Sequence, residues 1–322
     1  MTRTLQIDSL TRRFGSVTAV DAVTLSVDEG EVFGLLGRNG AGKSTLLKIL
    51  TTLLPPSAGH ASVGGFDIVD RSTQVRRLIG YVPQSLSADG ELTGYENLLV
   101  FARLYDIPRR ERADRIREGL EFMGLADAAH RLVATYSGGM IRRLEIAQSM
   151  LHRPRVLFLD EPTVGLDPVA RDVVWSHIGG LRDRYRMTIV LTTHYMEEAE
   201  RLCDRVVIMD HGRVIADDTV PGLHRKLPAA RSATLQLEGA PVTDELLDRL
   251  GALPGIGAVV RISGGIRIDT DDFGAPLMRC LETLTAAGAR VASVRTGQVR
   301  LEEVFIALTG RALRDDPAPA QP

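Results

Sequence analysis

The sequence predicts an α/β domain built on a buried parallel sheet, followed by a small α+β domain. The runs VLFLD (156–160) and TIVLTT (188–193) consist mainly of apolar and β-branched residues, so both faces of each run are apolar. This pattern is typical of strands that are covered on both faces. Strand-like and helical stretches alternate up to about Leu227, and this alternation indicates an α/β layer architecture. With 322 residues, the chain is long enough for about two domains.

The elements of the first domain follow from local patterns. LQIDSLTRRF (5–14) and VTLSVDEGEVFGLLG (23–37) have the pattern of strands joined by turns. TLLKILTTL (45–53) has a helical pattern, and we expect the prolines at 55–56 to stop it. The stretch 93–125 is mostly helical and rich in charge. RVVIMDHGRVIADD, which ends at Asp218, indicates a hairpin around its His-Gly pair.

The second domain is predicted over residues 231–310. Its pattern is strand, helix, two strands around Ser263-Gly264-Gly265, helix, strand and helix, which is consistent with a split βαβ arrangement. Residues 228–230, Pro-Ala-Ala, are predicted to link the two domains. The tail 311–322 contains the run DDPAPAQP and is expected to be disordered.

Charge and hydropathy exclude two classes of protein. The net charge of −2 and pI near 6.4 argue against a dedicated nucleic-acid binder, so no nucleic-acid partner is expected. The opening residues MTRTLQIDSL lack the apolar core of a signal peptide. No stretch approaches 18 consecutive apolar residues, so no segment is expected to span a bilayer.

Residues 37–44, GRNGAGKS, fit the phosphate-binding pattern G-x-x-x-x-G-K-S/T, and they lie between a predicted strand and a predicted helix. Glycines allow backbone N–H groups to approach phosphate oxygens, and the helix N-terminus adds positive potential. Lys43 would reach the β- and γ-phosphates, and the Ser44 hydroxyl would coordinate Mg²⁺. A plain glycine-rich turn is the alternative. The predicted nucleotide-contacting residues of this loop are Gly37, Asn39, Gly40, Gly42, Lys43, Ser44 and Thr45.

Two acids follow the buried strand 156–160 directly. Asp160 is its last residue, at the edge where parallel sheets bind ligands, and it can hold Mg²⁺ through water. Glu161 is positioned to orient and deprotonate the attacking water. Adjacent surface acids without a catalytic role are the alternative.

The strand 188–193 is followed by His194. A lone histidine before a helix can be a cap or a surface residue. Because this one ends the next predicted sheet strand, we expect its side chain to contact the γ-phosphate.

With these motifs in order, residues from about Leu5 to Leu227 resemble the nucleotide-binding subunits of ATP-binding cassette (ABC) transporters. Ser137-Gly138-Gly139, which heads a helix running to about Leu151, is similar to the signature motif of that family. The resemblance implies a P-loop NTPase core, with ATP and Mg²⁺ as cofactors and a helical subdomain at about 85–150. It also implies a homodimer, in which each signature motif binds the γ-phosphate held by the other protomer. A serine hydroxyl and N–H groups free of side chains at a helix start form an anion site.

Three further positions match the family locally. Phe14 lies where an aromatic ring stacks on adenine, although core packing is the alternative. Gln84, in YVPQ, matches the loop glutamine that senses Mg²⁺ and water, and a plain polar loop residue is the alternative. Gly165-Leu166-Asp167 matches the loop through which the protomers contact each other, and a simple turn is the alternative.

The signature departs from its commonest form, because Tyr136 and Met140 replace a leucine and a glutamine. YSGGM followed by arginines is similar to the daunorubicin-type drug-resistance exporters of the same superfamily. LEEVFIALTG (301–310) also resembles the closing motif of that subfamily, although it could be only an amphipathic helix.

The resemblance implies an ATPase on the cytoplasmic face of the cell membrane that drives efflux of a hydrophobic drug, antibiotic or lipid through a separate permease. Gln84 and the segment 85–117 are the expected docking surface, and the second domain has an accessory or regulatory role. The alternatives are an importer ATPase and a soluble cassette ATPase acting on DNA or ribosomes. A P-loop GTPase or small-molecule kinase has less support, because the sequence has no NKxD motif.

Overall fold

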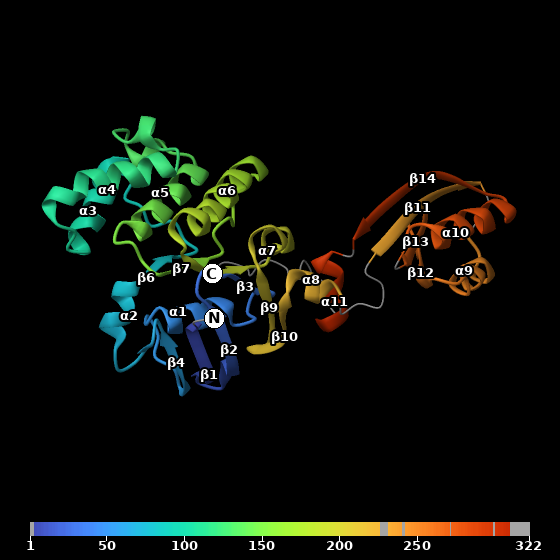
Figure 1. The fold of residues 1–322 in the computed structure, drawn as a ribbon, viewed down its shortest axis with the longest axis horizontal. Coiled ribbons are helices and arrows are strands. Elements are labelled where there is room, and N and C mark those ends of the chain that lie inside the picture. Colours follow the sequence, from blue (N-terminus) through green and yellow to red (C-terminus); the bar gives the residue numbers. More distant parts are fainter. Residues whose placement is uncertain (1–2, 226–230, 240–241, 271, 299, 310–322) are drawn as a thin grey trace. The chain divides into compact units, whose positions relative to one another are not determined.

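A computed structural model describes residues 3–225, 231–239, 242–270, 272–298 and 300–309. The predicted linker at 228–230 and the predicted tail at 311–322 lie outside these residues. The chain divides into two compact units, and the division falls between Val220 and Pro221 (Figure 1). Each unit is considered by itself.

A six-stranded sheet forms the centre of the first unit, in the order β10-β9-β3-β8-β7-β6. The strands β3, β6, β7, β8 and β9 run parallel, and β10 pairs antiparallel with β9 as the predicted hairpin. All residues of β3, β7 and β8 are buried, which confirms the prediction of a sheet covered on both faces. The strand bounds are β3 Val32–Leu36, β6 Ile79–Val82, β7 Val156–Asp160, β8 Thr188–Thr193, β9 Arg205–Asp210 and β10 Arg213–Thr219.

The strand order brings three sequence motifs to one edge. β8 lies between β3 and β7, and all three strands point the same way. The register sets Thr192 opposite Asp160, and Thr193 opposite Leu36, the last residue before the phosphate-loop motif. The carboxyl ends of these strands therefore lie side by side.

A second, antiparallel sheet has the order β2-β1-β4-β5. Its strands are β1 (Arg3–Phe14), β2 (Val17–Asp28), β4 (Ala58–Val63) and β5 (Phe66–Asp67). Buried side chains of β1 and β2 share one hydrophobic core with β3 and with helix α1 (Lys43–Leu50). This packing anchors the start of α1 between the two sheets.

The helix predicted for 45–53 is shorter than expected. α1 ends at Leu50, before the chain reaches the prolines at 55–56. The Thr51 hydroxyl donates to the Leu47 carbonyl at 2.8 Å, and Thr52 adopts a left-handed backbone with φ 64°. These two threonines therefore end the helix, and the prolines lie in the chain after it.

Helices α3 (Gly94–Leu104), α4 (Arg109–Phe122) and α5 (Gly138–Met150) form a group beside α6 (Pro168–Tyr185), shown in green in Figure 1. Thr93 starts α3 with a capping box, in which its hydroxyl accepts from the backbone N–H of Glu96 and the Glu96 carboxylate accepts from the backbone N–H of Thr93. The remaining α-helices described in this unit are α2 (Ser72–Leu78) and α7 (Met196–Leu202), and α8 (Val220–His224) starts at the boundary. Two short 3-10 helices, Ala126–Ala128 and Val133–Thr135, precede α5.

The second unit has the predicted strand and helix order. Its antiparallel sheet has the order β12-β13-β11-β14, and α9 and α10 contribute to its core with Leu250, Cys280 and Leu284. This is the split βαβ arrangement, and it confirms the α+β assignment. The bounds are β11 Arg231–Gly239, α9 Asp244–Gly251, β12 Ile256–Ile262, β13 Gly265–Thr270, α10 Ala275–Ala286, β14 Ala289–Gln298 and α11 Leu301–Thr309.

Candidate active site at the carboxyl edge of the sheet

The loop between β3 and α1 packs closely against its neighbours. A Cβ atom on Gly37 would lie 2.4 Å from the Met209 carbonyl oxygen, and one on Gly42 would lie 2.3 Å from the Ala19 carbonyl oxygen. Neither position has room for a side chain. Gly40 has φ +81°, and a Cβ atom built there would have nothing within 4 Å. Glycine is needed at this position because the backbone is left-handed, not because space is short. The fold itself therefore requires glycine at all three positions.

The other predicted residues of this loop differ in exposure. Asn39 is exposed, whereas Ser44 and Thr45 are partly buried at the start of α1. Lys43 is 4% exposed, and its Nζ donates to the carbonyl oxygens of Gly37 at 2.7 Å and Arg38 at 3.0 Å. The ammonium group of Lys43 is therefore buried and is hydrogen-bonded to the backbone of its own loop.

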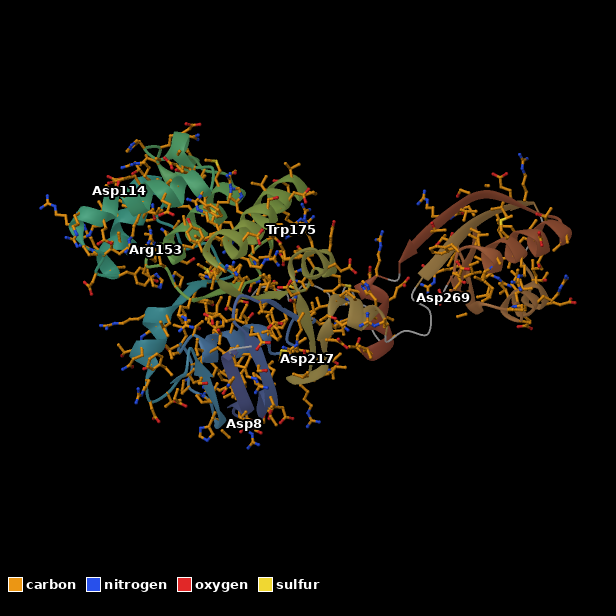
Figure 2. All side chains as sticks on the ribbon, in the orientation of Figure 1. Asp8, Asp114, Arg153, Trp175, Asp217 and Asp269 are labelled. Carbon is orange, nitrogen blue, oxygen red and sulfur yellow. The ribbon has the colours of Figure 1, made fainter. Side chains whose placement is uncertain are left out.

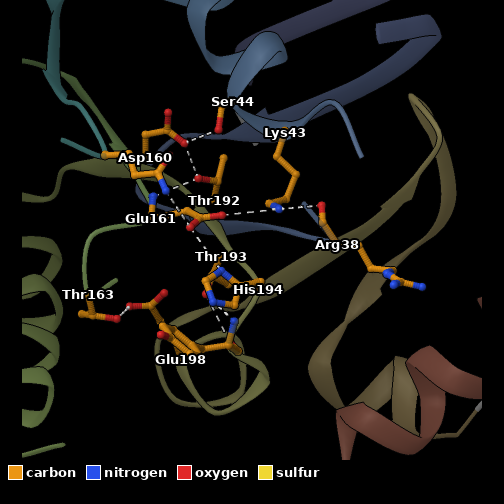
Figure 3. A network of polar contacts seen from close by, with 12 residues as sticks. Arg38, Lys43, Ser44, Asp160, Glu161, Thr163, Thr192, Thr193, His194 and Glu198 are labelled. Atoms are coloured by element: carbon orange, nitrogen blue, oxygen red, sulfur yellow. Dashed lines mark hydrogen bonds and ion pairs between the residues drawn. The ribbon is translucent and has the colours of Figure 1, made fainter. Parts of the chain in front are cut away.

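Ser44 and Asp160 meet across the site (Figure 3). The Ser44 hydroxyl donates to Oδ1 of Asp160 at 2.8 Å, and the Thr192 hydroxyl donates to the same oxygen at 2.7 Å. Asp160 is only 2% exposed. A carboxylate and a hydroxyl are hard oxygen donors of the kind that Mg²⁺ prefers, so these side chains fit the ion predicted from the sequence.

Glu161 lies at the centre of the candidate site. Its Oε2 is 3.1 Å from Nδ1 of His194, and its Oε1 is 3.5 Å from Nζ of Lys43 (Figure 3). The same Oε2 is 3.3 Å from Nε2 of Gln84. Its backbone has φ 48°, in the left-handed region where a non-glycine residue is strained. Its N–H donates to the hydroxyl of Thr192 at 2.9 Å, which holds this conformation.

Electrostatics keep this carboxyl group ionised. Burial acts to raise the pKa of Glu161, but the hydrogen bond from His194 and the charge of Lys43 outweigh it and lower the pKa below its usual value. Burial in turn lowers the pKa of Lys43, and the charges of Glu161 and Asp160 oppose that effect. A carboxylate with hydrogen-bond donors on both sides can accept a proton from a positioned water.

Gln84 is held in place by the helix that carries the signature motif. Arg142 of α5 is 1% exposed and donates to the carbonyl oxygens of Pro83 and Gln84, both at 2.6 Å. Glu145 on the same helix lies 3.1 Å from Arg142 and accepts from the hydroxyl of Ser87 at 3.1 Å. The arginines after YSGGM entered the sequence interpretation only as part of a family pattern, so their contact with this loop was missed.

Ser137 is the N-cap of α5, and its hydroxyl accepts from the Met140 N–H at 3.3 Å. Cβ atoms added at Gly138 and Gly139 would lie 3.3 Å from a Leu166 side-chain carbon and 2.9 Å from Cβ of Ala170. The glycines thus allow α5 to approach the segment around the start of α6. This contact within one chain is a reason for glycine that the sequence interpretation did not include.

The remaining predicted residues are Phe14 and the segment 165–167. Phe14 ends β1 with its ring 44% exposed, 4.6 Å from the Arg12 guanidinium carbon. Gly165 has φ +75°, and Asp167 caps α6 by accepting from the Ala170 N–H at 2.9 Å. Phe14 is therefore exposed rather than packed in the core, and Gly165 adopts a turn conformation, while the adenine and protomer contacts of these residues stay predictions.

Glu198 was not predicted from the sequence. Its Oε1 accepts from the Thr163 hydroxyl at 2.7 Å and from the Trp175 indole N–H at 2.8 Å, and the residue is fully buried. It therefore ties the loop after Glu161 to α6 and α7. Burial raises its pKa, against the effect of the hydrogen bonds that it accepts. No signal in the helical pattern MEEAE separates this acid from its neighbours.

The fold and this site define a P-loop ATPase. Residues 20–164 match the family model described as ABC transporter. The chain is 42% identical over 318 residues to the daunorubicin/doxorubicin resistance ATP-binding protein DrrA of Streptomyces peucetius, covering 98% of this chain and 94% of that protein. It is 35% identical to the linearmycin resistance ATP-binding protein LnrL of Bacillus subtilis (strain 168), covering 97% and 100%. The chain therefore belongs to the ATP-binding proteins of ABC transporters, as its motifs predicted, and it is an ATPase.

Solved structures agree. One described as the ATP binding subunit of an ABC transporter shares 32% identity with a TM-score of 0.62, covering 69% of this chain and 92% of that chain. CbiO1 from Clostridium perfringens, part of the ABC transporter complex cbiONQ, shares 26% identity with a TM-score of 0.64, covering 71% and 97%. The relatives DrrA and LnrL match nearly the whole chain, whereas these structures match about the length of its first unit.

Proposed function

We propose that this chain is the ATP-hydrolysing subunit of an exporter. Two copies clamp two ATP molecules between them, and hydrolysis drives efflux of a hydrophobic drug, antibiotic or lipid through a separate permease. The contacts of Glu161 with Lys43, Gln84 and His194 are the single observation that carries the ATPase chemistry. The printed names of DrrA and LnrL, both resistance proteins, favour export.

Each residue of the site has a role in this proposal. The loop of residues 37–45, with Lys43, binds the phosphates, and Glu161 accepts a proton from the attacking water at its carboxylate. His194 holds that carboxylate in place and contacts the γ-phosphate. Ser44, Asp160 and Gln84 would hold Mg²⁺, which supplies positive charge against the phosphate oxygens when bound.

The dimer is supported by the position of the signature motif. In the described part of the chain, the Ser137 hydroxyl bonds only within its own helix, and none of the contacts of Glu161 or Asp160 involves Ser137, Gly138 or Gly139. A helix start with a serine and two glycines binds an anion well. In the proposed dimer, that anion is the γ-phosphate held by the partner, while Phe14 stacks on adenine within its own protomer.

The permease is proposed because no helix in the described part of the chain is long and apolar enough to cross a membrane. The segment 85–117 exposes Leu86, Val100 and Leu104, with Leu104 70% exposed. These apolar side chains suit docking against a membrane protein. The proposal places the chain at the cytoplasmic face of the membrane, and gives the second unit an accessory role in dimerisation or coupling.

Isolation of the tagged chain from detergent-solubilised membranes of its native host tests this proposal. We expect stoichiometric recovery of one protein with several predicted membrane-spanning helices, identified by mass spectrometry. Leu104→Glu should abolish that recovery, and Leu53→Glu, at a residue 58% exposed outside segment 85–117, should preserve it. Recovery of ribosomal or DNA-repair proteins alone would contradict the transport role and leave the ATPase chemistry standing.

A further inference from the structure

A cavity of about 350 Å³ lies within the first unit, at the opposite edge of the central sheet from the candidate active site. Of its lining residues, Arg155 directly precedes β7 and Met187 directly precedes β8, so the cavity lies at the amino ends of these strands. Five residues of β7, at about 3.3 Å each, separate it from Asp160 by about 16 Å. A volume of this size is in the range of small-molecule sites.

The cavity has an apolar floor. Ala147, Met150 and Leu151 at the end of α5 are buried, as is Met187, and the Tyr185 ring stands beside them. The lining comes from two parts of the unit, namely helices α4 and α5 and the segments before β3, β7 and β8. An occupant would therefore contact both parts.

The rim of the cavity is positively charged. Four arginines and two carboxylates line it, namely Arg115, Arg153, Arg155 and Arg186 against Glu29 and Glu118. Arg153 lies 3.4 Å from Glu118, and Arg155 lies 3.0 Å from Glu29, in half-exposed pairs that contribute little in water. No ion pair of the Arg186 side chain is found among the described residues. The balance of charge therefore favours an anion.

Two of these arginines have a backbone that favours glycine. Arg153, labelled in Figure 2, has φ 57° in the turn after α5, and Arg186 has φ 51° as the C-cap of α6. Glycine is the usual residue at such left-handed helix ends, because a Cβ atom is disfavoured there. At the end of α5, the Leu151 carbonyl accepts a hydrogen bond from Arg115 at 3.0 Å. Both of these strained arginines line the same cavity. Glu161, which has the same kind of strained backbone, lies in the candidate active site, and strained residues often occur at functional sites.

We propose that this cavity binds a small amphipathic anion. Its apolar body lies on the floor formed by Met150, Leu151 and Met187, and its single acidic group is held by Arg153 and Arg186. The site is independent of the nucleotide site, and it stands whether or not the chain is an exporter subunit. Guanidinium groups hold such anions by charge-assisted hydrogen bonds.

The test uses 8-anilinonaphthalene-1-sulfonate, whose aromatic body and one sulfonate match this description. The full-length chain is titrated with the dye in the presence of excess Mg²⁺ and ADP, which occupy the nucleotide site, and fluorescence is measured. We expect saturable binding with about one dye per chain.

The double variant Arg153→Gly/Arg186→Gly should weaken dye binding by about tenfold or more, because both guanidinium groups are lost. Its Tm should be at or above that of the unaltered chain, because glycine adopts the left-handed backbone without strain. Arg110→Ala, which removes an exposed arginine of α4 outside the cavity, should leave the affinity unchanged.

Two further measurements separate charge from folding. Arg153→Lys/Arg186→Lys keeps both charges but loses the planar guanidinium groups, so it should lose less affinity than the glycine variant. N-phenyl-1-naphthylamine has the same ring system without the sulfonate and should bind about tenfold more weakly or worse. The proposal is overturned by absence of saturable dye binding, by full affinity in the glycine variant, by equal losses in the lysine and glycine variants, or by equal binding of the uncharged dye.

Discussion

His194 Nδ1 lies 3.1 Å from Oε2 of Glu161, although the two residues are 33 positions apart. They meet because β7 and β8 are adjacent parallel strands, and each residue directly follows the end of its strand. The nitrogen must carry a proton to donate to an ionised carboxylate. This bond, with the charge of Lys43, lowers the pKa of Glu161 against the effect of burial. His194 is therefore placed to act directly on Glu161, the proposed general base.

Glu161→Gln should keep ATP binding and lose hydrolysis by about 10²–10⁴-fold, because the amide cannot accept the proton of the attacking water. ATP should then trap a stable dimer. ATPase assays and analytical ultracentrifugation with ATP measure the two effects. Glu197→Gln, at an exposed position on α7, is the control and should behave as the unaltered chain. Unchanged turnover in Glu161→Gln would rule out its role as the base.

His194→Ala should move the acid limb of the kcat–pH profile to higher pH. The hydrogen bond from His194 lowers the pKa of Glu161, so its loss lets burial raise that pKa, and the carboxyl group then ionises only at higher pH. The profile is measured at saturating ATP. A lower kcat with an unmoved acid limb would mean that His194 acts on the phosphate alone.

Ser137→Arg should leave nucleotide binding by the monomer intact and abolish turnover, because the arginine blocks the site completed in the partner. Lys43→Ala should also be inactive. Mixing the two inactive variants should restore activity, since one of the two composite sites then combines an intact phosphate loop with an intact signature motif. The ATPase rate of the mixture is compared with that of each variant alone. A mixture without activity would place Ser137 in its own protomer's site or in folding.

Glu198→Gln should stabilise the chain increasingly as pH rises. Burial raises the folded-state pKa of Glu198 above its unfolded value, so its contribution to stability is full below the unfolded pKa and is lost as pH rises through the folded pKa. Glutamine does not titrate, and its amide oxygen can still accept from Thr163 and Trp175. The difference in Tm between variant and parent is measured across pH, and a constant difference would contradict the assignment.

Thr163→Val probes the other end of the same contact. It removes one of the donors to the buried Glu198 carboxyl group, and it should lower the free energy of unfolding by about 1–3 kcal/mol. Urea denaturation of the full chain measures this loss. Ser176→Ala, at an exposed hydroxyl of α6, is the matched control and should change the free energy by much less. Equal effects of the two variants would show that the Thr163 contact has no special role.

Deletion of the chain from Arg231 onward should spare ATP binding and impair dimerisation or coupling. The residues proposed to contact the nucleotide all lie before Val220, in the first compact unit. Nucleotide affinity, the dimer trapped by the Glu161→Gln change and drug tolerance of the host are the readouts. Full transport activity in the deleted chain would refute an accessory role for the second unit.

The sequence by itself determined the family of this protein and predicted the residues of its candidate site. Phosphate-loop glycines, a lysine and a serine lie between a strand and a helix, and Asp160, Glu161 and His194 each end or follow an apolar run. Since parallel strands end at one edge of a sheet, these local patterns already placed the acids, the histidine and the loop together. The same local patterns predicted the order of elements in the second unit, because alternation and turns are short-range properties.

Only the tertiary structure decided which side chains meet. Local patterns do not encode that β8 lies between β3 and β7, and this order sets Thr192 against Asp160. The contact of Arg142 with the Gln84 loop and the burial of Glu198 depend on helices packing across long stretches of chain. Such contacts depend on how helices and strands are placed in three dimensions. Periodicity in the sequence reports only the local structure of each element. The strained Arg153 and Arg186 came together at one cavity for the same reason.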